Sequence, residues 1–272
     1  MIDSKKQLEL RNAYNPDGSQ LRNLQLHLLD ILKVVDSICR RNHITYWLGS
    51  GTLLGAVRHD GFIPWDDDVD IEIYRKDRKR FISACKKELP DYLKIQYHNT
   101  EPDYYLNILK VRDNVSDIGE KIHLGKNGEY DVNYECRGYF IDIFCIESCI
   151  PVFLDISNKL LYRILCKRYA HKKSRFYCHI LWLLMESLNS VFRTISVLFA
   201  NKNVLYPGYS SCFGSLYGYK RDYINPIKYH QFENSEFCIP ADSDSYLHDM
   251  YGDYMELPEE RLRNGNHSSI DK

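Results

Sequence analysis

A short β-strand with carboxylates on one of its faces is the feature that most constrains this chain. Residues 66–73 read DDDVDIEI. Side chains alternate between the two faces of a strand, so one face here is apolar and should meet a core. That face carries Val69, Ile71 and Ile73. The opposite face presents acids: Asp66, Asp68, Asp70 and Glu72.

The acidic face indicates a cation site. Carboxylates roughly 7 Å apart along a strand repel one another unless a cation lies between them. Oxygen ligands in this arrangement suit Mg²⁺ or Mn²⁺, held together with substrate phosphates. On this segment alone, a solvated acidic edge remains an open alternative.

A Gly-Ser-Gly turn upstream favours the metal interpretation. Residues 44–48 have the β-branched and aromatic composition of a strand, and Gly49, Ser50 and Gly51 then open a helix. Free backbone N–H groups at such a position bind phosphate oxygens well. A phosphate loop beside a metal-binding strand would hold one phosphate-bearing substrate.

A third acid lies in another predicted strand. Residues 138–146 read GYFIDIFCI, with Asp142 on a face that is otherwise apolar. Burying a carboxylate without partners costs several kcal/mol. Asp142 could be capped by backbone donors at a strand end. We favour the alternative that it lies beside Asp68 and Asp70, as a metal ligand or as general base for an acceptor hydroxyl.

The order of elements predicts an α+β fold. Strands and helical patterns interleave over residues 1–150, which we expect to be the catalytic core. Residues 151–224 change to long apolar helical segments with a basic cluster at 167–175, and we expect a helical insertion there. Residues 225–272 form a C-terminal segment that would complete the site.

The second helix of the insertion, residues 179–200, has one polar and one apolar stripe. We expect it to be too interrupted to cross a membrane. Packing against the catalytic domain is the favoured interpretation. A basic cluster followed by an amphipathic helix can also lie on an anionic membrane surface, which leaves peripheral membrane contact open.

Composition limits the partners and the compartment. The formal net charge of −1 gives no electrostatic reason to expect a nucleic-acid partner. The nine cysteines are scattered without a Cys-x-x-Cys pair, as expected for reduced thiols. The N-terminal residues lack the apolar core of a signal peptide. We therefore expect a cytoplasmic protein, with any membrane contact at the inner face.

Residues 46–71, YWLGSGTLLGAVRHDGFIPWDDDVDI, resemble the LicD family, which includes phosphocholine transferases and fukutin-related proteins. LKVRDN at 109–114 and FIDIF at 140–144 are similar to its middle strands, and residues 232–267 resemble its C-terminal signature. The resemblance implies a nucleotidyltransferase-like mixed sheet flanked by helices. Residues 150–225 match no motif of the family.

The resemblance also implies a reaction. A phosphate-linked small group would pass from a CDP-linked donor to a hydroxyl of a glycan or lipid-linked glycan, such as a lipopolysaccharide, teichoic-acid or capsule precursor. Gly49, Ser50 and Gly51 would hold donor phosphates, Asp68 and Asp70 would bind Mg²⁺ or Mn²⁺, and Asp142 would be the third catalytic acid. The further substrate-binding candidates are Arg58 on the donor phosphates, with Asp66, Asp67, Lys110, Arg112 and Asp253.

Several alternatives stay open. Arg58, Lys110 and Arg112 could instead be ion-pair residues, and Asp253 could have a structural role at a helix end. A nucleotidyltransferase that uses a nucleoside triphosphate would need the same loop and acids, although its gap between them is usually shorter than that from Gly49 to Asp68. A non-catalytic binding protein could keep the same fold. Phosphocholine, glycerol phosphate and ribitol phosphate all remain candidates for the transferred group.

Overall fold

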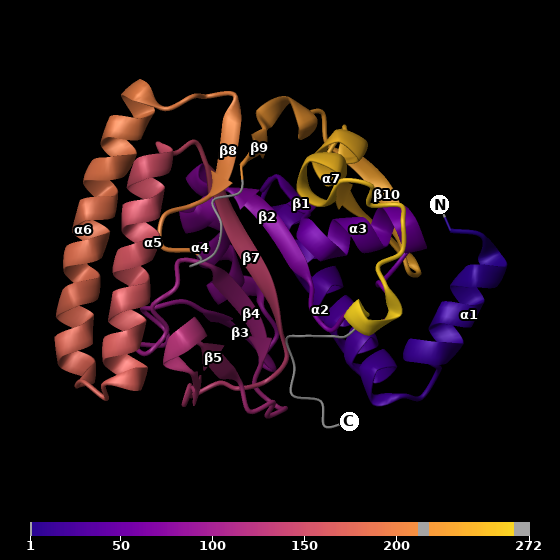
Figure 1. Cartoon of the computed structure of the whole chain (residues 1–272), viewed down its shortest axis with the longest axis horizontal. Helices are drawn as coiled ribbons and strands as arrows, with labels where there is room; N and C mark the ends of the chain where they lie inside the picture. The colour runs from indigo at the N-terminus through magenta and orange to yellow at the C-terminus, as the bar shows by residue number, and fades with distance from the viewer. Residues whose placement is uncertain (1, 212–217, 264–272) are drawn as a thin grey trace.

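The computed structural model describes residues 2–211 and 218–263 (Figure 1). The end of the expected C-terminal segment, from residue 264 onward, lies outside the described residues. Within them the chain is a mixed α/β structure with one large sheet, helices against it and two small hairpins. The prediction of an α+β fold with a mixed sheet flanked by helices is confirmed.

The large sheet has the strand order β1-β2-β7-β4-β3, with β8 added to β7 and β9 added to β8. Strands β2 and β7 run parallel, and the other pairs are antiparallel. The strands are β1 (Tyr46–Leu48), β2 (Asp70–Tyr74), β3 (Leu93–Gln96), β4 (Leu109–Asp113), β7 (Phe140–Glu147), β8 (Val204–Pro207) and β9 (Tyr219–Lys220). The hairpins are β5 (Lys121–His123) with β6 (Glu129–Asp131), and β10 (Lys228–Phe232) with β11 (Ser235–Ile239).

Seven α-helices are present in the described residues: α1 (Ser4–Tyr14), α2 (Gln20–Arg41), α3 (Ser50–His59), α4 (Arg78–Glu88), α5 (Pro151–Leu165), α6 (Arg175–Phe199) and α7 (Ser243–Tyr251). The Ser19 hydroxyl caps α2, as is favourable at a helix start. Helices α2 and α4 contact each other, and they pack on β7, β4 and β3. The apolar side chains of α2, among them Leu28, Leu32 and Val35, are buried in this interface.

The acidic strand has the predicted alternation on its apolar side. Val69, Ile71 and Ile73 are all buried in the main core. The strand proper starts at Asp70, and residues 66–69 approach it as an irregular segment. Glu72 lies on the acidic side but is also buried, so this side is only partly open to solvent.

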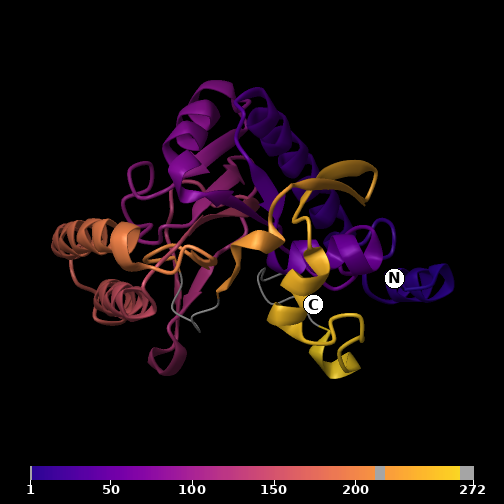
Figure 2. The ribbon, with the colours of Figure 1, turned by 90° about the horizontal axis from the view of Figure 1, so that it is seen from above.

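Helices α5 and α6 form a hairpin at one end of the molecule, with α6 outermost (Figures 1 and 2). The chain returns from α6 to the large sheet through β8. Helix α6 is continuous, and it is the one helix of the described residues that is long and apolar enough to cross a membrane by length and composition. The expectation that this segment is too interrupted was wrong, because its interior holds only two charged side chains, Glu186 and Arg193.

Helix α3 packs tightly against the turn that follows it. A Cβ atom on Gly55 would lie 2.5 Å from the carbonyl oxygen of Gly61 and 3.2 Å from the Ile63 nitrogen. Neither backbone atom can move without displacing the turn. This turn leads directly into the acidic segment, so the small side chain helps to position it.

We therefore expect Gly55→Ala to destabilise the protein by about 2 kcal/mol, because overpacking outweighs the better helix propensity of alanine. The measurement is urea unfolding followed by circular dichroism. Ser190→Ala, on an exposed face of α6, is the matched helix control and should change stability by less than about 0.5 kcal/mol. Equal effects of the two substitutions would contradict the proposed close packing.

Candidate active site

The glycine-rich turn lies directly against the start of the acidic strand. The Gly49 N–H donates to the Asp70 carbonyl oxygen at 3.0 Å, and the Asp70 N–H donates to Thr52 Oγ1 at 2.8 Å. A Cβ atom on Gly51 would lie 3.2 Å from Asp66 Oδ2. The structure thus brings together the predicted phosphate loop and the predicted acids, and α3 begins beside them.

Four carboxylates gather on one side of the sheet, and we call them the acidic cluster: Asp66, Asp68, Asp70 and Asp142. Asp70 and Asp142 are register partners on the parallel strands β2 and β7, which places their Cα atoms about 5 Å apart. Burial first, and then the charges of Asp68 and Asp142, raise the pKa of Asp70 well above its usual value. Burial, Asp68 and Asp67 raise the pKa of Asp66 in the same way.

The fourth predicted acid of the segment, Asp67, is more buried than the three others. It borders a small cavity together with Asp68 and with Leu24 and Leu28 of α2. Its charge acts on Asp66. Asp67 therefore adjoins the acidic cluster as a buried neighbour.

The acidic cluster has the chemistry of a site for a hard divalent cation, because all its ligands are oxygen atoms. Asp142 Oδ1 is buried and accepts no hydrogen bond from the described residues. In their present rotamers, no three Asp, Glu, His or Cys side chains of the described part converge to hold an ion. A cation could be held after side-chain rotation, and it would relieve the repulsion that raises the pKa values of Asp66 and Asp70.

Lys110 is the cation nearest to this cluster. Its Nζ lies 2.9 Å from Asp142 Oδ1 and 3.2 Å from the ring centre of Phe140. Lys110 and Asp142 are register partners on β4 and β7. The ammonium group lacks hydrogen-bond geometry to that oxygen, so the pair is an ionic contact.

The two arginines predicted to bind substrate make hydrogen bonds in different parts of the protein. Arg112 is fully buried and donates to the Gly138 carbonyl oxygen and to Glu120. Arg58, on α3, donates to the carbonyl oxygens of Tyr254 and Glu256. Burial, followed by the charge of Arg263, lowers the pKa of Arg58 to about 10. Both guanidinium groups bind backbone oxygens, and Arg58 fastens the C-terminal segment to α3.

One residue of α7 lies within the electrostatic influence of the acidic cluster, and sequence reasoning missed it. Burial and then the charges of Asp70, Asp66 and Asp68 raise the pKa of Tyr251, the last residue of α7. The predicted candidate Asp253 follows two residues later and is exposed. In the sequence, the only sign of this residue was an aromatic side chain before the Gly252-Asp253 pair. That sign did not show toward which part of the protein the side chain points.

Strand alternation placed Glu72 on the acidic face, but sequence reasoning missed its structural role. Its carboxylate accepts hydrogen bonds from Trp47 Nε1 at 2.5 Å, Tyr219 Oη at 2.6 Å and Tyr246 Oη at 3.1 Å. A Cβ atom on Gly49 would lie 2.9 Å from Glu72 Cγ. Burial raises the pKa of Glu72 to about 7, and the three donors oppose this shift. Glu72 thus joins β1, β9 and α7 beneath the glycine-rich turn.

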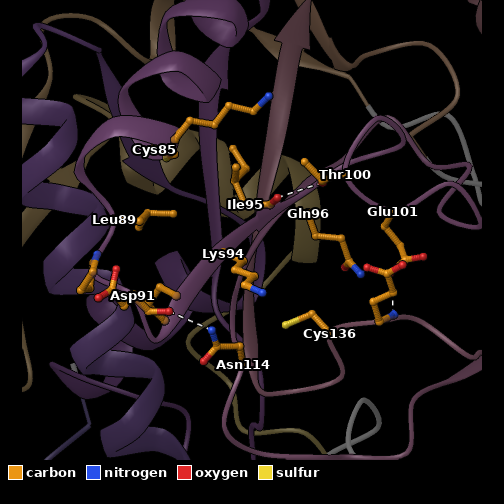
Figure 3. A pocket seen from close by; sticks show the side chains of 14 residues that line it. Cys85, Leu89, Asp91, Lys94, Ile95, Gln96, Thr100, Glu101, Asn114 and Cys136 are labelled. Atoms are coloured by element: carbon orange, nitrogen blue, oxygen red, sulfur yellow. Dashed lines mark hydrogen bonds between the residues drawn. The ribbon is translucent and has the colours of Figure 1, made fainter.

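A cavity of about 670 Å³ lies elsewhere, beside the edge strand β3 (Figure 3). None of the predicted site residues lines it. Gln96 borders it with a buried amide that has no hydrogen-bond partner among the described residues. We assign the candidate active site to the acidic cluster, because its carboxylates lie beside the glycine-rich turn. The cavity borders neither the acidic cluster nor that turn.

The fold and site together define an α+β protein with a carboxylate-rich site on a mixed sheet. Residues 43–114 match the family described as LicD/FKTN/FKRP, nucleotidyltransferase domain. The chain is 29% identical to the lipopolysaccharide cholinephosphotransferase LicD of Haemophilus influenzae, over 91% of this chain and 96% of that protein. It is 44% identical to human ribitol 5-phosphate transferase FKRP over 18% of this chain and 10% of that protein. The resemblance to the LicD family that the motifs predicted is therefore confirmed, with the family's nucleotidyltransferase domain matched over residues 43–114.

The raised pKa of Asp70 predicts a stability effect with a definite sign. The folded state disfavours the charged form, so stability is lost as pH rises from the unfolded value of about 4 through the raised folded value. In metal-free protein at pH 8, Asp70→Asn should therefore raise the melting temperature by about 2 °C.

The gain should vanish below about pH 4, where both forms are neutral. Differential scanning fluorimetry with a chelator present measures it, and the exposed Asp131→Asn is the control. A lower melting temperature for Asp70→Asn at pH 8 would contradict this prediction, because it would show that the folded state favours the charged carboxylate of Asp70.

Glu72→Ala should destabilise the protein by about 3 kcal/mol, because three buried donors lose their shared acceptor. Chemical denaturation measures the change. Glu236→Ala removes an exposed glutamate from β11 and should be close to neutral. A similar small effect for Glu72→Ala would rule out the hydrogen-bonded network beneath the turn.

Proposed function

We propose that this chain transfers phosphocholine or a polyol phosphate from a CDP-activated donor to a hydroxyl of a cell-surface glycan. The chain is a phosphotransferase that resembles the LicD family, and the relatives named above are a cholinephosphotransferase and a ribitol 5-phosphate transferase. The observation that supports the proposal is the acidic cluster beside the glycine-rich turn. A turn that binds phosphate and acids that bind a cation would together hold a nucleotide diphosphate.

In the proposed site, the turn formed by Gly49, Ser50 and Gly51 holds the donor phosphates. The Gly49 N–H already donates to the Asp70 carbonyl oxygen, so the N–H groups of Ser50 and Gly51 would bind the phosphate oxygens. Asp68 and Asp70 hold Mg²⁺ or Mn²⁺, with Asp66 in support. When bound, the ion would offset charge that develops on the leaving CMP. Lys110 is the cation best placed to contact a phosphate oxygen, since it already lies 2.9 Å from Asp142 Oδ1.

Asp142 is proposed as the general base. The acceptor hydroxyl oxygen attacks the phosphorus that carries the small group, and its proton passes to the Asp142 carboxylate. A new P–O bond to the sugar forms as the bond to CMP breaks, and CMP leaves with the electron pair. The buried Asp142 Oδ1 supports this role, because its contact with Lys110 Nζ is ionic and it accepts no hydrogen bond from the described residues.

The finer architecture is also a proposal. We propose a nucleotidyltransferase-like core over residues 1–150, a helical insertion over 151–224 and a family-type C-terminal segment over 225–272 that completes the site. The Arg58 contacts to Tyr254 and Glu256, and the electrostatic effect of the acidic cluster on Tyr251, support this role for the C-terminal segment.

We also propose a cytoplasmic location. The eight cysteines of the described residues are all free thiols, and seven of them are buried. Such thiols are typical of proteins from a reducing compartment. The ninth, Cys212, lies outside the described residues.

The experiment is a turnover assay with CDP-choline, CDP-glycerol and CDP-ribitol, an acceptor oligosaccharide, and Mg²⁺ or Mn²⁺. ³¹P NMR separates CMP from a new phosphodiester. We expect one donor to be consumed, and Asp142→Asn to lower kcat by about 10²–10⁴-fold, the usual contribution of a general base.

The exposed Asp131→Asn is again the matched control and should retain activity. Consumption of a nucleoside triphosphate with release of pyrophosphate would instead identify a nucleotidyltransferase. Full activity in Asp142→Asn would exclude this residue as the base.

A further inference from the structure

The polar side chains of α6 face the protein rather than the solvent. Asn189 is fully buried, and its amide donates to Glu186 Oε1 at 2.7 Å and to Ser210 Oγ at 2.8 Å. Arg193 pairs with Glu147 on β7 at 3.1 Å. Helix α6 thus uses its polar stripe for packing, the reverse of an ordinary surface helix.

The outward face of α6 is mainly apolar, with a few hydroxyl groups among large apolar side chains. Six of its large apolar side chains are more than half exposed: Phe176 (76%), Leu184 (63%), Val191 (53%), Val197 (67%), Leu198 (71%) and Phe199 (75%). After Arg175, the helix has no Asp, Glu, Lys or Arg other than the inward-facing Glu186 and Arg193. A helix of this length spans about 37 Å, so the strip exceeds the scattered apolar residues of a usual surface.

Two of the hydroxyl groups on this face are satisfied within the helix. Ser187 Oγ donates to the Leu183 carbonyl oxygen at 2.8 Å, and Thr194 Oγ1 donates to that of Ser190 at 3.0 Å. Such bonds satisfy hydroxyl groups within a helix. The exposed strip is therefore suited to apolar contact rather than to a partner that forms many hydrogen bonds.

Cations lie at the start of this strip. Lys172 and Lys173 are exposed in the turn before α6, and neither has an ion-pair partner within the described residues. Arg175 follows them, is 55% exposed and pairs with Asp103 at 2.9 Å. The hairpin forms an end of the molecule with α6 outermost in both views, so the strip and the lysines are accessible together (Figures 1 and 2).

We propose that the outward face of α6 docks on an anionic lipid bilayer, with the helix lying along the surface. Its apolar side chains would enter the boundary between headgroups and acyl chains, and Lys172 and Lys173 would contact acidic headgroups. The inward contacts of Asn189 and Arg193 keep α6 on the protein, because leaving it would expose their buried partners. The helix therefore lies on the membrane and does not span it.

The test is flotation of the full chain with vesicles of phosphatidylcholine and phosphatidylglycerol, against phosphatidylcholine alone. Wild type should float with the anionic vesicles at low salt and less at high salt. Leu184→Glu with Leu198→Glu should reduce the bound fraction at least about tenfold. Lys172→Glu with Lys173→Glu should reduce it at least about fivefold on anionic vesicles only.

Leu8→Glu, at a 59% exposed leucine on α1, is the matched control and should float like wild type. Circular dichroism melting should show that every variant is folded. Failure of wild type to float, or normal flotation of the Leu184/Leu198 variant, would overturn the proposal.

Two further outcomes would also overturn it. A lipid-free dimer, lost in the Leu184/Leu198 variant by light scattering, would assign the face to a second copy of the chain. Resistance of the cellular protein to extraction at alkaline pH would make α6 a membrane span. The turnover assay uses soluble substrates, so its result is independent of all these outcomes.

Discussion

The pairing of Asp70 with Asp142 on neighbouring parallel strands is the constraint on which the site depends. Register alone places two carboxylates side by side, and Asp66 and Asp68 add two more charges from the preceding segment. Such an arrangement is unfavourable in the absence of a cation. The surroundings reduce the cost only in part, through the Lys110 contact on Asp142. The fold therefore concentrates negative charge beside the glycine-rich turn, where a bound cation would be stabilising.

Much of this could be predicted from the sequence, because the controlling signals are local. Strand alternation identified Val69, Ile71 and Ile73 as core residues, and the same period aligned the acids on the other face. The burial of Glu72 and its hydrogen bonds could not be predicted in this way. Its donors come from β1, β9 and α7, and no local pattern connects Trp47, Tyr219 and Tyr246. A strand acid is buried or exposed according to partners distant in the chain.

Helix α6 illustrates a second limit. Periodicity revealed a polar and an apolar stripe, but it could not show which stripe faces the protein. That choice depends on Asn107, Glu147 and Ser210, which provide polar contacts beneath the helix. The two arginines of the candidate list illustrate the same limit, since the sequence cannot show that Arg58 binds the carbonyl oxygens of the C-terminal segment.

The most direct measurement for the central claim is Mn²⁺ binding, followed by electron paramagnetic resonance with and without a CDP-linked donor. If the acidic cluster is the cation site, wild type binds about one Mn²⁺ with oxygen ligands, and Asp70→Asn loses that binding while remaining folded. The donor should tighten the binding, because its phosphates complete the ligand set. Equal Mn²⁺ affinity in Asp70→Asn, or no binding by wild type in the presence of any donor, would contradict the account.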